Sequence, residues 1–125
     1  MNSFLLDTDC SIYAMLGTHP RLRARLAECE PEEVAISAIS FAEILMGENR
    51  GYPPDQDAIE DFLSVVPLLP FDEAAARAYA KLPFKRARFD RLLAAHALSI
   101  GAIVITNNEA DFADVPGLTI ENWTI

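Results

Sequence analysis

The feature that most constrains the fold of this chain is the alternation of short apolar runs with helical patterns. Residues 3–6 are apolar and end at Asp7, as expected for a buried strand with a polar residue at its carboxyl end. Similar short runs occupy residues 34–37 and 102–105. Strands that alternate with helices predict an α/β fold, in which helices cover both faces of a parallel sheet.

The helical segments are recognised by apolar spacing and by their stop signals. Gly17, Gly47 and Gly101 are expected to end helices, and Pro67 places the strand that contains it near a sheet edge. The 125 residues suffice for one compact domain, spanning residues 1–125. The predicted helices cover residues 11–16, 20–28, 40–47, 59–63, 72–82 and 91–100, and the further strands cover 65–69 and 118–120.

The charge balance restricts the partners of the chain. Ten Lys and Arg stand against nineteen Asp and Glu, which gives a net charge of −9. So acidic a chain is a poor non-specific binder of nucleic acid. Either the acids only keep the protein soluble, or some of them are gathered to hold cations. Six of the ten basic residues lie within residues 77–91. They could form either a solvated helix face or a local phosphate-binding face.

Nothing in the sequence indicates export or membrane insertion. The apolar start is interrupted by Asp7 and Asp9 and lacks a basic region, so it does not resemble a signal peptide. No apolar run approaches the roughly 18 residues that span a bilayer. Cys10 and Cys29 match no zinc or redox spacing. We therefore expect a cytoplasmic protein with reduced thiols and no membrane contact.

Four acids stand out because they occupy strand ends or helix starts, where ligand sites of α/β sheets lie. If they converge, their repulsion would be relieved by Mg²⁺ or Mn²⁺, which prefer carboxylate oxygens and can activate water against a phosphodiester. Nearby hydroxyl and amide groups could complete the site. The four acids are Asp7, Glu43, Asp90 and Asp111, and the supporting candidates are Thr8, Asp9, Ser40, Thr106, Asn107 and Asn108.

Each acid also has a purely structural interpretation. Asp7, Asp9 and Asp90 could each cap the helix that follows, and Ser40 with Glu43 fits a capping box. Asp111 could be an ordinary loop residue. His96, in the middle of an apolar helix, is better explained as a packed or hydrogen-bonded histidine than as a general base.

The order of these motifs resembles the PIN-domain toxins of the VapC type, over essentially the whole chain. Each segment alone is a weak match, whereas their order and spacing together are specific. The segments are 4–9 (FLLDTD), 36–45 (ISAISFAEIL), 89–98 (FDRLLAAHAL) and 104–112 (VITNNEADF), with 115–118 and 121–123 near the end.

This resemblance implies a PIN-like α/β/α sandwich with a mostly parallel central sheet. It implies an endoribonuclease dependent on Mg²⁺ or Mn²⁺, a toxin blocked by a VapB-like antitoxin, and a homodimer. The family's acidic positions fall on Asp7, Glu43, Asp90 and Asp111, and its hydroxyl and amide positions fall on Thr8, Ser40, Thr106 and Asn107.

The chain departs from the family at two places. Asp9 stands where the family usually has Asn, so an extra carboxylate could join the metal site or cap a helix. The segment before Asp90 is short and basic, which makes Arg86, Arg88 and Arg91 candidate contacts to an RNA backbone.

Two other classes of function stay open at this point. Asp7-Thr8-Asp9 approximates the nucleophile motif of haloacid-dehalogenase-like phosphatases. That class and the receiver domains both need a late Lys, whereas the last Lys here is Lys85. The chain could also be a non-catalytic PIN-like binding module.

Overall fold

The computed structural model describes residues 3–83 and 89–125 of the chain. Its centre is a five-stranded sheet in the order β3-β2-β1-β4-β5, and all four strand pairs are parallel. The expected parallel α/β sheet is therefore confirmed, with β1 as its middle strand. The strands are β1 (Phe4–Leu6), β2 (Val34–Ser37), β3 (Leu68–Leu69), β4 (Ile103–Ile105) and β5 (Ile120–Glu121).

Six α-helices connect the strands, and several begin at a side-chain cap. Asp7, Ser37, Asp55 and Asp72 each accept a hydrogen bond from a backbone N–H in the first turn of a helix, which satisfies a donor that the helix leaves free. The helices are α1 (Thr8–Leu16), α2 (Pro20–Ala27), α3 (Ala38–Asn49), α4 (Gln56–Leu63), α5 (Glu73–Ala80) and α6 (Phe89–Ile100), with short 3₁₀ turns η1 (Pro31–Glu33) and η2 (Glu109–Asp111).

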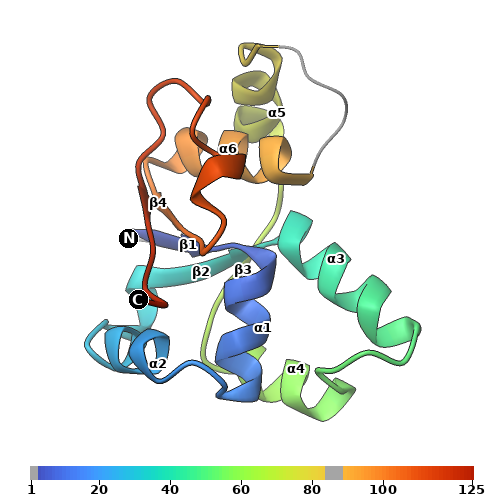
Figure 1. Ribbon diagram of the computed structural model, residues 1–125. Coiled ribbons are helices and arrows are strands. Elements are labelled where there is room, and N and C mark those ends of the chain that lie inside the picture. Colours follow the sequence, from blue (N-terminus) through green and yellow to red (C-terminus); the bar gives the residue numbers. More distant parts are fainter. Residues whose placement is uncertain (1–2, 84–88) are drawn as a thin grey trace.

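The two faces of the sheet are covered by different helices (Figure 1). Since side chains alternate along a strand, Leu5 and Val104 face one way and pack with Leu93 of α6. Leu6 and Ile105 face the other way and pack with residues of α1 and α2. A third cluster joins β2 to α3 and α4. The result is the α/β/α sandwich that the sequence predicts.

Several predicted helix boundaries were wrong. The helices predicted to begin at residues 11 and 59 begin at Thr8 and Gln56. Gly47 does not end α3, which continues to Asn49. In the turn that follows this helix, the glycine with a positive φ is Gly51. The cap of α3 is Ser37, so Ser40 lies inside the helix and does not form the capping box considered with Glu43. Asp90 is the second residue of α6 and not the residue before it.

The carboxyl-terminal segment is anchored by Trp123, which is 1% exposed. Its ring packs edge-on against Phe4, its Nε1 donates to Glu121 at 2.8 Å, and the Arg25 guanidinium lies 4.7 Å from the ring centroid. Within the described part of the chain, no helix is long and apolar enough to cross a membrane.

We predict that Trp123→Ala lowers the free energy of unfolding by about 3–5 kcal/mol, because a large buried side chain leaves a cavity. Urea unfolding followed by circular dichroism measures this. Ile125, which is 79% exposed, provides the control, since Ile125→Ala should change stability by about 0.5 kcal/mol or less. Equal effects of the two substitutions would contradict the anchoring role.

Candidate active site

Three polar residues lie side by side at the carboxyl edge of the sheet. Leu6 of β1 is in register with Ile36 of β2 and with Ile105 of β4. The residues that follow these three are Asp7, Ser37 and Thr106, and their exposed fractions are 5%, 0% and 0%. The position expected for Asp7 and Thr106 is therefore the one observed, whereas Ser37 was not among the predicted site residues.

The Asp7 carboxylate is held by hydrogen bonds from its neighbours. It accepts a hydrogen bond from the Cys10 N–H at 2.8 Å and another from the Thr106 side chain. Burial raises the pKa of Asp7 above its ordinary value; the two hydrogen bonds oppose this rise, and the charge of Asp9 adds to it. The ionised form is thus destabilised at this position unless positive charge is supplied.

A second link joins the start of α1 to the middle of α3. The Thr8 hydroxyl donates to Glu43 Oε1 at 2.6 Å, across 35 residues of sequence. One turn earlier on α3, the hydroxyl of Ser40 is buried and has no hydrogen-bond partner among the described residues. Thr8, Ser40 and Glu43 therefore belong to the neighbourhood predicted for them.

The polar turn after β4 is tied to α1. Asn108 Nδ2 donates to Asp9 Oδ2 at 3.1 Å, and Asn107 Nδ2 donates to the Tyr13 hydroxyl at 3.2 Å. The Asn108 backbone N–H donates to Thr106 Oγ1 at 2.9 Å. The other amide atom of Asn107, the acceptor Oδ1, is buried and finds no partner within residues 3–83 and 89–125. Asp9 is thus engaged with this turn and does not cap α1, a role that Asp7 fills.

The remaining two acids are carried by α6 and η2. Asp90 is half-buried at the start of α6, which packs against α3. Asp111 is exposed and ends η2, directly before the buried Phe112. Among the described residues, no three His, Cys, Asp or Glu side chains gather closely enough to hold a metal ion. The structure therefore does not show a closed cage of four carboxylates.

The side chains at this edge nevertheless fit a hydrated hard cation. Mg²⁺ keeps several of its waters and is commonly held by only one or two carboxylates. The buried carboxylate of Asp7 and the unpartnered oxygens of Ser40 and Asn107 are oxygen donors of the kind that such an ion prefers.

The structure argues against one predicted phosphate contact. The Arg91 side chain is 4% exposed, and its Nη2 donates to Asp114 Oδ2 at 2.8 Å. An RNA backbone could reach this guanidinium only by displacing that ion pair. Arg86 and Arg88, the other two predicted contacts, lie outside the described residues.

His96 is hydrogen-bonded, as predicted, and its partner is Ser37. Ser37 Oγ and His96 Nδ1 lie 2.7 Å apart. The signal that could have identified Ser37 is its place at the end of β2, equivalent to Asp7 on β1 and Thr106 on β4. Its partner His96 lies 59 residues away, a separation that no local pattern can bridge.

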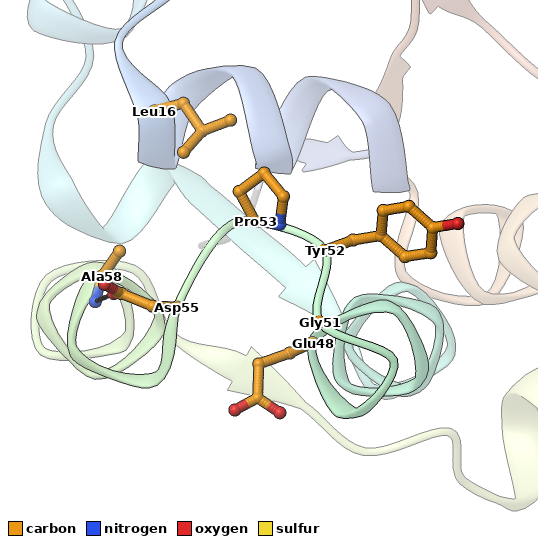
Figure 2. A pocket seen from close by; sticks show the side chains of 7 residues that line it. All are labelled: Leu16, Glu48, Gly51, Tyr52, Pro53, Asp55 and Ala58. Carbon is orange, nitrogen blue, oxygen red and sulfur yellow. Dashed lines mark hydrogen bonds between the residues drawn. The ribbon is translucent and has the colours of Figure 1, made fainter.

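A separate hollow of about 400 Å³ lies between the end of α1 and the connection from α3 to α4 (Figure 2). Leu16, Tyr52 and Pro53 line it together with the acids Glu48 and Asp55. Since none of the predicted site residues lines this hollow, it is distinct from the carboxyl edge of the sheet.

Comparison with known proteins places this arrangement in a family. Residues 4–118 match the PIN domain. A tRNA(fMet)-specific endonuclease VapC from Shigella flexneri is 31% identical, covering 99% of this chain and 100% of the relative. The protein of the same name from Salmonella typhimurium is 30% identical, covering 98% and 99%.

Solved structures agree with this placement. VapBC from Salmonella typhimurium in its DNA-bound form has a TM-score of 0.87 at 28% identity, covering 98% of this chain and 99% of the matched chain. VapBC2 from Rickettsia felis, bound to a promoter DNA fragment, has a TM-score of 0.85 at 26% identity, covering 96% and 98%. With its sheet edge, its motif order and these relatives in agreement, the chain belongs to the PIN-domain family, among the VapC toxins.

Proposed function

We propose that this chain is a metal-dependent endoribonuclease and the toxin of a toxin–antitoxin pair. The observation that carries the proposal is the buried Asp7 carboxylate, which has a raised pKa. It lies at the edge of the sheet where three neighbouring parallel strands end. Two similar proteins are named tRNA(fMet)-specific endonucleases, and another is named a ribonuclease. The family assignment excludes the phosphatase and receiver alternatives.

The proposed reaction is hydrolysis of an RNA phosphodiester. Water adds to phosphorus and the bond to the 3′ oxygen breaks, which leaves a 5′-phosphate on one fragment and a 3′-hydroxyl on the other. The chemistry that Mg²⁺ or Mn²⁺ supplies when bound is activation of that water and neutralisation of phosphate charge. Asp7, Glu43, Asp90 and Asp111 are the proposed ligands, directly or through water.

The chain's own groups hold these ligands in place. The Thr106 hydroxyl and the Cys10 N–H orient the Asp7 carboxylate, and Thr8 orients Glu43. Ser40 and Asn107 offer buried oxygens to water or to the ion. Because Asp9 is bound to Asn108, its additional charge holds the turn after β4 against α1.

Partners follow from the relatives. The similar structures are VapBC complexes of toxin and antitoxin, two of them bound to DNA. We infer that a VapB-like antitoxin binds this chain and that the toxin forms a homodimer. A cytoplasmic location, as expected from the sequence, suits an enzyme that acts on RNA.

Asp7→Asn should abolish RNA cleavage and at the same time stabilise the metal-free protein. The amide can still cap α1, but it cannot bind a cation as a carboxylate does. The loss of activity should exceed the loss of about 10- to 100-fold that is typical of residues which only support a metal ligand. Initiator tRNA and total RNA are the substrates to test.

The sign of the stability change follows from the pKa of Asp7. Because that pKa is raised in the folded chain, ionisation at neutral pH weakens folding; this penalty shrinks as the pH falls through the raised pKa and is gone only below the ordinary pKa of the unfolded chain. A gain of about 1 kcal/mol would raise the unfolding midpoint by roughly 4 °C. Asp55→Asn makes the same change at the exposed cap of α4 and should alter neither RNA cleavage nor the stability of the metal-free protein. Full activity of Asp7→Asn would refute the proposal.

Metal dependence is tested separately by thermal unfolding. Mn²⁺ should raise the unfolding midpoint of the wild-type chain, because a ligand that binds only the folded state stabilises it. Asp7→Asn should lose this response, and Glu43→Gln should weaken it. EDTA should stop cleavage, and Mg²⁺ or Mn²⁺ should restore it. Cleavage that persists in EDTA would contradict the metal-dependent mechanism.

A further inference from the structure

A buried hydrogen bond connects two elements that carry acids of the proposed site. Ser37 is 0% exposed and His96 is 2% exposed, and Ser37 Oγ lies 2.7 Å from His96 Nδ1. Ser37 ends β2 and caps α3, which carries Ser40 and Glu43. His96 lies on α6, which carries Asp90.

The Ser37 hydroxyl takes part in two hydrogen bonds. Ser37 Oγ already accepts a hydrogen bond from the Ile39 N–H at 3.0 Å. Burial lowers the pKa of His96 below its ordinary value, and the charge of Asp72 acts in the opposite direction. In the neutral tautomer that carries its proton on Nε2, the Ser37 hydroxyl donates to Nδ1 while its oxygen accepts from the Ile39 N–H, so both functions of the hydroxyl are used. Phe71 packs edge-on against the ring, with centroids 5.8 Å apart.

This bond fixes the start of α3 on α6. Glu43 is six residues from Ser37, and Asp90 is six residues from His96, so each acid lies less than two helical turns from the bond. The Thr8–Glu43 hydrogen bond then connects the same helix α3 to the start of α1. A single directional contact therefore sets the spacing between acids on different elements.

An apolar pair could fill the same space without removing polar groups from water. A buried polar pair instead restricts the arrangement of its elements, because each partner is satisfied in only one geometry. Ser40 lies one turn beyond Ser37 on the same helix α3, so its position is restricted together with that of Ser37.

We propose that His96 is a positioning residue for the acidic site: through Ser37 it fixes α3 on α6 and so sets Glu43 relative to Asp90. This inference rests on the proposed nuclease function. His96 itself touches neither RNA nor metal in this proposal.

The test compares four variants in three measurements. The variants are His96→Leu, His96→Asn, the double variant Ser37→Ala with His96→Leu, and Asp55→Ala. The measurements are Mn²⁺ affinity by titration calorimetry without RNA, the cleavage rate of initiator tRNA at saturating Mn²⁺, and unfolding in urea.

His96→Leu should reduce Mn²⁺ affinity and cleavage rate by about 10- to 100-fold, as for other residues that orient metal ligands. His96→Asn should retain much of the Mn²⁺ affinity and of the cleavage rate, because Oδ1 of the asparagine occupies the place of Nδ1 and can accept the same hydrogen bond. The double variant leaves neither polar partner buried without the other but also removes the cap of α3, so its stability should stay below that of the wild type, and its Mn²⁺ affinity should stay low.

Asp55→Ala controls for the loss of a helix cap, since Asp55 caps α4 as Ser37 caps α3. It should lose stability and keep wild-type Mn²⁺ affinity. If the double variant binds Mn²⁺ and cleaves RNA like the wild type, His96 is only structural and the inference is wrong, while the proposed function stands. If the wild type neither binds Mn²⁺ nor cleaves RNA, both fail together.

Discussion

The buried carboxylate of Asp7 is the constraint on which the site depends. β1 is the middle strand of the sheet, so the residue after it emerges between the ends of β2 and β4. A carboxylate that is 5% exposed requires compensation. The Cys10 N–H and the Thr106 side chain supply hydrogen bonds but no full positive charge. Under the proposed function, this is the position where a cation would bind before any substrate arrives.

The elements that build the fold also build the site. Asp7 caps α1 and Ser37 caps α3, and both residues lie at the carboxyl edge of the sheet. Helix capping and site formation are therefore compatible roles of one side chain, not alternatives. The reason is geometric, because a helix that follows a parallel strand begins where the strand ends. A polar residue that caps such a helix therefore also lies at the carboxyl edge of the sheet.

Local patterns predicted much of this structure. Apolar periodicity indicated the strands and helices, and the parallel arrangement followed from their alternation, which placed Asp7 and Thr106 at one edge. Gly47 was misassigned because glycine is tolerated inside a helix, whereas the turn after α3 needs the positive φ found at Gly51. The pairing of Arg91 with Asp114 could not be predicted, because burial and charge partners depend on how distant segments pack.

Charge explains why the cation matters beyond the reaction itself. The chain carries a net charge of −9, and several of its arginines already bind carboxylates: Arg25 binds Glu121, Arg77 binds Glu73 and Arg91 binds Asp114. An RNA phosphate that approaches Asp7 would meet repulsion at this edge. A divalent ion held there reverses the sign of that interaction at close range. Under the proposed function, metal and RNA therefore bind cooperatively, and by thermodynamic reciprocity RNA must strengthen metal binding by the same factor.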